Sequence, residues 1–167
     1  MKVLFFFFAW SFMIYSPLFC QSSNTYKAEQ DGWLVNLEEA YNLSKKSGKP
    51  IMANFTGSDW CGWCKRLAAA VFDQPEFKKW ADKNVVLLEL DFPRRKEIPM
   101  DIRQQNASLQ RAFQVRGYPT VWIFEIDKPA GSNEFTVNPL GKTGYKPSVE
   151  EFTSDVDRML KNGNSLK

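Results

Sequence analysis

The chain has 167 residues, of which 44% are hydrophobic and 25% are charged, as is usual for a globular protein of one domain. Its formal net charge of +3 is too small to favour nucleic acid or an anionic membrane surface as a partner. The sequence contains no histidine, which excludes Cys-His and Ser-His nucleophile pairs and histidine-ligated metal sites.

The first 20 residues are typical of a secretion signal. Lys2 supplies a positive start, residues 3–15 are almost wholly apolar, and Pro17 interrupts the run. The run is shorter than the roughly 20 residues that a membrane-spanning helix needs, so removal is favoured over retention as an anchor. We therefore predict a signal peptide at residues 1–20 and export to the periplasm or another extracytoplasmic compartment.

Cys20 allows a second interpretation of the amino terminus. Residues 18–20 resemble a degenerate lipoprotein box, in which Cys20 is lipidated and becomes the first residue of the mature protein. Such boxes usually carry a small residue before the cysteine, whereas this chain has the bulky Phe19. Cleavage after Cys20 is the favoured interpretation, and lipid anchoring through Cys20 is the alternative.

The mature chain is predicted to begin with a flexible polar lead-in at residues 21–32. Compact elements then alternate along the chain, bounded by capping residues, glycines and prolines. They are a short edge strand at 33–35, a helix capped by Asn36 and ended by Gly48, a strand at 50–55, a helix at 64–72 and a short helix from Pro75 to about Ala81.

The second half of the chain opens with the most regular strand pattern, at residues 85–91. An irregular stretch at 92–105 follows, with two prolines and a basic cluster, and it is either a solvated insertion or a lip that selects partners. The remaining elements are a helix capped by Asn106 and ending near Phe113, strands at 120–126 and 134–140, and a last helix capped by Ser148.

The order β-α-β-α-β-α-β-β-α predicts an α/β domain with a central mixed sheet that is covered by helices on both faces. We place this domain at residues 33–162 and a short tail at 163–167.

Cys61 and Cys64 are three residues apart, where a turn after an apolar strand meets a helix. This spacing puts both sulfurs on one helical face, and the helix start favours a thiolate at Cys61. Cys64 lies one turn deeper and is expected to be better shielded. Disulfide exchange uses such a pair, because an exposed thiolate attacks and a second thiol resolves the mixed disulfide. Lys65 adds a positive charge nearby, which solvent and salt screen.

Two other uses of the cysteine pair fit the sequence less well. Zinc needs four ligands, and without histidine or Cys20 only carboxylates would complete the site. A purely structural disulfide across so short a loop would add little stability. We therefore predict no metal and no bound cofactor, and a redox-active disulfide between Cys61 and Cys64.

A second motif, GYPT at residues 117–120, directly precedes the strand at 120–126. Together with WCGWCK at 60–65, it resembles the thioredoxin superfamily. The stretches FTGSDW at 55–60 and LDFP at 90–93 resemble the bacterial secreted thioredoxin-like proteins of the thioredoxin-7 type, near the periplasmic disulfide-reductase and isomerase branches. The resemblance extends from about Trp33 to Leu160 and implies a thioredoxin-like fold.

The resemblance also implies roles for individual residues. The bond before Pro119 would be cis and face the cysteines, and the backbone of Tyr118 would pair with an extended substrate segment. Trp60 is expected to pack in the core. Trp63 is expected to be partly exposed and to offer a flat contact to peptide substrates.

Asn54 departs from the family pattern. Thioredoxins proper carry a buried aspartate at this position, which helps to deprotonate the deeper cysteine, and an amide cannot accept that proton. Glu89 and Asp59 are the candidates to replace it. Trp63 also replaces the common proline of the family, and the two residues between the cysteines, here Gly62 and Trp63, tune the redox potential. Since potentials in the superfamily span roughly −270 to −120 mV, reduction, isomerisation and oxidation all stay open.

The sequence as a whole predicts an exported thiol–disulfide oxidoreductase that acts on protein thiols and disulfides, with a monomer favoured. A reducing role would draw electrons from a membrane partner. One alternative is a thioredoxin-like adaptor or holdase with a structural disulfide. Another is a thiol peroxidase, which would use a single acidified cysteine with a nearby Thr and Arg. The surroundings of Cys61 in the sequence do not resemble that arrangement.

Overall fold

The computed structural model describes residues 26–132 and 134–164. The predicted signal peptide, Cys20 and the last three residues of the predicted tail lie outside the described residues. Within the described part of the chain, no helix is both long enough and apolar enough to cross a membrane.

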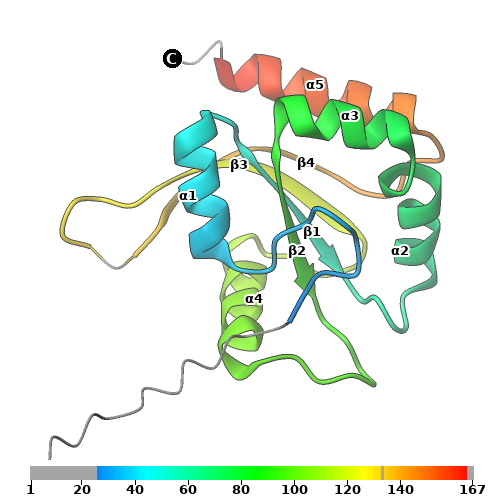
Figure 1. The fold of residues 1–167 in the computed structure, drawn as a ribbon, viewed down its shortest axis with the longest axis horizontal. Helices are drawn as coiled ribbons and strands as arrows, with labels where there is room; N and C mark the ends of the chain where they lie inside the picture. Colours follow the sequence, from blue (N-terminus) through cyan, green and yellow to red (C-terminus); the bar gives the residue numbers. More distant parts are fainter. Residues whose placement is uncertain (1–25, 133, 165–167) are drawn as a thin grey trace, which may run out of the picture.

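Four strands form one mixed sheet at the centre of the molecule (Figure 1). The order along the sheet is β2 (Val86–Asp91), β1 (Ile51–Thr56), β3 (Thr120–Asp127) and β4 (Thr136–Thr143). β1 runs parallel to β2 and antiparallel to β3, and β3 and β4 are also antiparallel. The strand predicted at 33–35 is reduced to a single bridge between Leu34 and Leu88.

Helices cover both faces of this sheet, as predicted. They are α1 (Leu37–Ser47), α2 (Gly62–Leu67), the π-helix η1 (Ala68–Phe72), α3 (Pro75–Asn84), α4 (Met100–Ala112) and α5 (Val149–Asn164). One apolar cluster joins the sheet to α1 and α4, and a second joins it to α2, η1, α3 and α5. The fold is therefore α/β with a helical layer on each side of the sheet.

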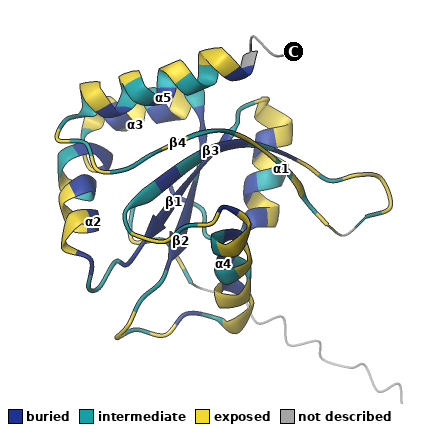
Figure 2. Cartoon of the chain, turned by 180° about the vertical axis from the view of Figure 1, so that it is seen from behind, coloured by how far each residue is buried: buried dark blue, intermediate teal, exposed yellow. Residues whose placement is uncertain are grey.

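β1 is the central element of the core. All six of its residues are buried, and Figure 2 shows β1 dark in the interior of the molecule. Because side chains alternate along a strand, Ile51 and Phe55 face α1 and α4, whereas Met52 and Asn54 face the layer that contains the cysteine helix. The polar Asn54 thus lies in an apolar layer beneath α2.

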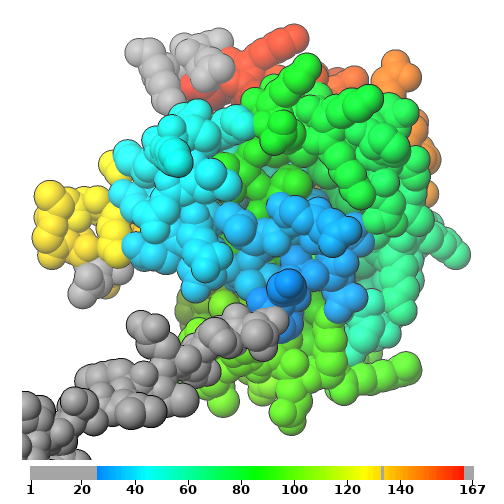
Figure 3. All heavy atoms as spheres, in the orientation of Figure 1, coloured from blue at the N-terminus to red at the C-terminus, as the bar shows by residue number. Residues whose placement is uncertain are grey.

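The described part of the predicted lead-in packs against the domain. Figure 3 shows residues 26–35, in blue, lying across the surface beside α1. The backbone N–H of Glu29 donates to the carboxylate of Glu89 at 2.9 Å, and the ammonium of Lys96 contacts the carboxylate of Glu29.

Helix α4 corrects the prediction for residues 92–113. It begins at Met100 with Pro99 as its N-cap, so Asn106 lies inside the helix and not at its start. Asn106 is only 1% exposed, and its Nδ2 donates to the carbonyl of Asp91 at 3.0 Å. Asparagine is frequent at N-caps, but here its amide satisfies a buried backbone carbonyl at the end of β2. Only residues 92–99 are irregular.

Two further boundaries differ from the sequence-based prediction. The cysteine helix begins at Gly62 and changes to a π-helix after Leu67, where the N–H of Asp73 donates to the carbonyl of Ala68 at 2.9 Å. The last strand begins at Thr136, which pairs with Asp127, the last residue of β3.

Replacement of Asn106 by alanine tests its structural role. Asn106→Ala should lower the free energy of unfolding by about 2 kcal/mol, because it leaves the buried carbonyl of Asp91 without this donor. Urea unfolding monitored by circular dichroism measures the change. The control is Ser108→Ala on the exposed face of the same helix, which should change stability by less than about 0.5 kcal/mol. Equal effects of the two variants would contradict the assigned role.

Candidate active site

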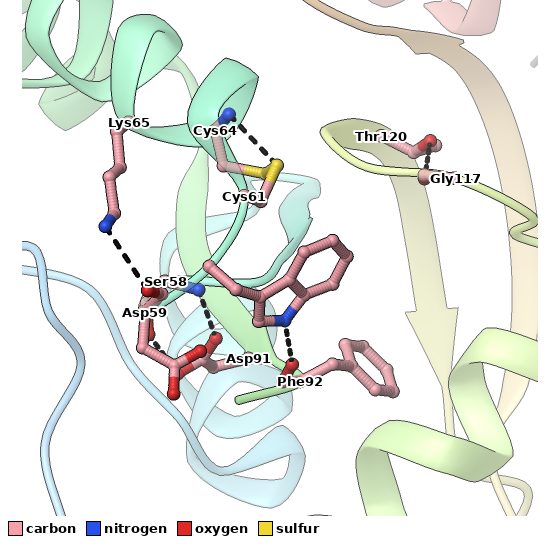
Figure 4. Close-up of a disulfide and its surroundings, with 10 residues drawn as sticks. Ser58, Asp59, Cys61, Cys64, Lys65, Asp91, Phe92, Gly117 and Thr120 are labelled. Atoms are coloured by element: carbon pink, nitrogen blue, oxygen red, sulfur yellow. Dashed lines mark hydrogen bonds between the residues drawn. A yellow bond between two sulfur atoms is a disulfide. The ribbon is translucent and has the colours of Figure 1, made fainter. Parts of the chain in front are cut away.

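Cys61 and Cys64 form a disulfide at the start of α2, with their Cα atoms 5.3 Å apart (Figure 4). Cys61 is the N-cap of the helix, and its Sγ accepts the backbone N–H of Cys64 at 3.1 Å. The preceding turn is closed by the N–H of Cys61, which donates to the carbonyl of Gly57 at 2.8 Å. The pair therefore lies at a helix start, as its spacing predicts.

The two cysteines are almost equally buried in this disulfide form. Cys61 is 5% exposed and Cys64 is 6% exposed. The expectation that Cys61 is exposed while Cys64 is shielded is therefore wrong for the oxidised state. Cys61 is buried because the turn that carries it is bonded to the end of β2 through Ser58 and Asp91.

Asp91 at the end of β2 holds the cysteine turn. Its carboxylate accepts the backbone N–H of Ser58 at 2.9 Å and the Ser58 hydroxyl at 2.7 Å, and it pairs with the ammonium of Lys96 at 3.0 Å. Asp91 is only 1% exposed. A buried carboxylate needs such partners to offset the loss of hydration, and they fix the turn that leads to Cys61.

Trp60 is half-buried and bonded on several sides. Its indole N–H donates to the carbonyl of Phe92 at 2.8 Å, and its ring meets that of Tyr118 edge-on at 5.8 Å. A Cβ atom at Gly57 would lie 2.5 Å from the Trp60 ring, so only glycine fits there. The guanidinium of Arg94 lies over the ring, 3.8 Å from its centroid. The expectation that Trp60 packs in the core is therefore wrong, because it is only half-buried, lies outside both apolar clusters and has a cation over one face of its ring.

The loop with GYPT lies across from the disulfide (Figure 4). The Tyr118–Pro119 bond is cis, as the resemblance implied. The Tyr118 ring stacks on Phe92 at 5.3 Å, and its hydroxyl accepts the side-chain N–H of Gln110 in α4 at 2.6 Å. The side chain of Tyr118 is thereby held toward α4, and its backbone lies just before the first paired residue of β3, Thr120.

An exposed aromatic pair includes Trp63, which lies between the two cysteines in the chain. Trp63 is 53% exposed, and its ring packs edge-on against that of Tyr145, which is 38% exposed, at 5.0 Å. The guanidinium of Arg66 lies 4.6 Å from the centroid of the Trp63 ring. The exposure predicted for Trp63 is confirmed. The sequence does not reveal Tyr145, because only the packing of the sheet brings the end of β4 beside α2.

Asn54 is a buried polar residue of β1 on the side of the sheet that carries the cysteine helix. Asn54 is 5% exposed, and its buried Oδ1 has no hydrogen-bond partner in the described structure. Glu89 is its register partner on β2 and bonds to Glu29, whereas Asp59 accepts backbone N–H groups of the loop after β2. Among the described residues, no hydrogen bond joins either carboxylate to Cys64.

The surroundings of Glu89 and Asp59 shift the pKa values of both carboxyl groups. Burial raises the pKa of Glu89 to about 7, and the nearby charge of Asp91 adds to the rise. Desolvation opposes a low pKa at Asp59, but hydrogen bonds from the N–H groups of Arg94 and Arg95 lower the pKa below its usual range. Lys65 points away from the sulfurs and donates to the carbonyl of Asp59 at 3.3 Å (Figure 4).

Comparison with known proteins agrees with this geometry. Residues 32–125 match the thioredoxin-like family, and the chain belongs to that family. The disulfide bond reductase DsbH of Chlamydia pneumoniae is 40% identical over 124 residues, which are 74% of this chain and 69% of that protein. The thioredoxin-related protein DsbJ of the same organism is 32% identical over 96 residues, 58% of this chain but only 28% of its own length.

The chain is also similar to the solved structure of a DsbH oxidoreductase, with a TM-score of 0.66 and 30% identity. The match covers 80% of this chain and 87% of that chain. The thioredoxin-like fold predicted from the sequence is therefore confirmed. With these relatives and a disulfide formed by the CGWC pair, the chain is a thiol–disulfide oxidoreductase.

Glu89 makes stability depend on pH. Its folded pKa of about 7 exceeds the ordinary value of 4.5, so protonation stabilises the fold and the gain is lost as the pH rises through about 7. Between about pH 4.5 and about pH 8, this group should remove about 3 kcal/mol from the free energy of unfolding.

Urea unfolding across this range measures the effect. Glu89→Gln should flatten the decline, whereas Glu134→Gln on an exposed turn should leave it as in the wild type. Parallel profiles for wild type and Glu89→Gln would refute this assignment.

Proposed function

We propose that the chain is an exported reductase of protein disulfides, with Cys61 as the nucleophile and Cys64 as the resolving thiol. The observation that carries this proposal is the disulfide at the start of α2, together with the cis Tyr118–Pro119 bond and the exposed Trp63. The reducing direction is supported by the relative named a disulfide bond reductase, at 40% identity.

The reaction balances as two successive exchanges. In the dithiol form, the Cys61 thiolate attacks one sulfur of a substrate disulfide, and the other sulfur leaves as a thiolate that takes up a proton. Cys64 then attacks Cys61 Sγ and loses its proton, the mixed disulfide breaks, and the second substrate thiol is released. Two electrons pass to the substrate, and the Cys61–Cys64 disulfide of the present structure is formed.

Cys61 is assigned as the attacking residue from its place at the N-cap. Its sulfur already accepts the backbone N–H of Cys64, and the same donor would stabilise a thiolate in the reduced form. Arg66 adds positive charge one turn further along, packed against Trp63. The amide of Asn54 cannot act as a base, so these dipoles and charges are the groups proposed to stabilise the thiolate at Cys61.

The surroundings of the disulfide suit an extended peptide. The Trp63–Tyr145 pair offers an exposed aromatic surface, and aromatic side chains of this kind contribute much of the binding energy at protein interfaces. The backbone of Tyr118 lies outside the pairing of β3 and would bond to the substrate by strand addition. Protein disulfides are therefore the proposed substrates.

Export is proposed from the pattern of residues 1–20, with cleavage after Cys20 and lipid anchoring as the alternative. Disulfides persist in extracytoplasmic compartments, so a reductase there needs a supply of electrons. The proposed donor is a dithiol carried by a membrane protein, which would reduce Cys61–Cys64 by the same exchange run in reverse. No bound cofactor is required, and the chain is proposed to act as a monomer.

Cysteine variants test the assigned roles. In insulin reduction with dithiothreitol, Cys61→Ser should lower activity to the uncatalysed background, because the attacking sulfur is gone. Cys64→Ser that is first reduced, then freed of dithiothreitol and mixed with insulin, should retain the attack but accumulate a mixed disulfide with the substrate, visible as a band that added reductant removes. Wild-type activity equal to that of Cys61→Ser would favour the adaptor or holdase.

The redox potential of the pair tests the direction of electron flow. A reductase should have a potential at the low end of the superfamily, near about −270 mV, measured by equilibration with glutathione or dithiothreitol and alkylation of the free thiols. A value near about −120 mV would assign the chain to oxidation instead.

A further inference from the structure

The loop of residues 93–98, called the basic loop below, is fixed to the turn that carries Cys61. The carboxylate of Asp59 accepts the backbone N–H of Arg94 at 3.1 Å and that of Arg95 at 2.6 Å. The indole of Trp60 donates to the carbonyl of Phe92, just before the loop. Asp59 and Trp60 immediately precede Cys61, so the basic loop keeps a set position at the edge of the active site.

A hollow of about 520 Å³ separates the basic loop from α4. Figure 1 shows this loop standing out from the sheet below α2, between the end of β2 and the start of α4. The charged side chains that line the hollow are those of Asp91, Arg94, Arg95, Lys96, Glu97 and Arg103.

Positive charge is in excess in this hollow. Lys96 is already compensated, because it pairs with Asp91 at 3.0 Å and also contacts Glu29. Among the described residues, the side chains of Arg94, Arg95 and Arg103 have no ion pair with a carboxylate. The exposed carboxylate of Glu97 is the acid that opposes them.

We propose that the basic loop and this hollow dock an acidic segment of the same protein whose disulfide Cys61 attacks. The proposal rests on the proposed function and adds a substrate class to it. Arginine forks bind carboxylates in pairs of hydrogen bonds. Three guanidinium groups without an ion pair in the part that the structure describes, opposed by the one carboxylate of Glu97, therefore favour an aspartate- or glutamate-rich segment. Because the loop is fixed to the cysteine turn, docking there would hold the substrate disulfide near the reactive sulfur and raise its effective concentration.

The test uses two peptides that share one disulfide and differ only in flanking residues, glutamate in one and lysine in the other. The rate of their reduction by the full chain is measured as kcat/KM at low salt and at about 0.5 M NaCl. Wild type should prefer the glutamate peptide by about tenfold at low salt, the lower end of electrostatic steering, and the preference should shrink in high salt.

Charge variants locate the effect. Arg95→Gln with Arg103→Gln should abolish most of the preference, and Arg95→Glu with Arg103→Glu should shift it toward the lysine peptide. The matched control is Lys78→Gln with Lys79→Gln, which removes the same charge from the exposed side of α3, far from the basic loop in Figure 1. The control should keep the wild-type preference. Unfolding midpoints verify that all variants fold.

The outcomes separate this proposal from the proposed function. If wild type reduces both peptides equally, or if the arginine variants keep the full preference, the docking proposal is wrong and the reductase proposal stands. Equal losses in the arginine variants and the lysine control would assign the effect to net charge and also overturn docking. If wild type reduces neither peptide, both proposals fail.

Discussion

The carboxylate of Asp91 is bonded on several sides where β2 ends. It accepts two hydrogen bonds from Ser58 and forms an ion pair with Lys96. The backbone carbonyl of the same residue accepts a hydrogen bond from the side-chain amide of Asn106. A carboxylate that is 1% exposed depends on such partners. The cysteine turn, the basic loop and α4 are all fixed to this residue, so the setting of the disulfide depends on it.

The segment before α1 completes the balance of charge around Asp91. Glu29 bonds to Glu89 through its N–H and to Lys96 through its carboxylate. Burial, with the charge of Asp91, raises the pKa of Tyr26 to about 12, so its phenol stays neutral beside these acids. Lys96 is the base that faces these acids. Burial alone would lower the pKa of its ammonium, but hydrogen bonds to Glu29 and Asp91 raise the pKa above its usual value. One ammonium thus links two carboxylates that would otherwise repel each other.

The sequence was sufficient for features that depend on neighbouring residues. The strands at β1, β2 and β3, the helix start at Cys61 and the turn before Pro119 all follow from local patterns and motifs. The predicted cap at Asn106 was wrong because an asparagine can bond within its own turn or, as here, to a strand 15 residues earlier in the chain. Local preference cannot tell these two uses apart.

The parts of the site that the sequence left out depend on tertiary packing. Tyr145 meets Trp63 only because β4 ends beside α2, and Arg94 covers Trp60 only because Asp59 fixes the loop. The expected difference in exposure between the cysteines also failed, because exposure depends on the surrounding elements and not on position within a helix. Contacts of this kind join residues that are far apart in the chain, so the local sequence pattern does not predict them.

The π-helix after α2 separates the two ends of the cysteine helix. A π turn holds one residue more than an α-helical turn, and here it places the adjacent Val71 and Phe72 both in the core. Deletion of one alanine from Ala68–Ala70 would restore α-helical spacing while the residues on either side keep their faces of the helix, because the π turn takes up one extra residue. Cys61 and Cys64 lie before this turn and would keep their place. A single residue can therefore be added to or removed from this turn without disturbing the disulfide before it or the buried residues after it.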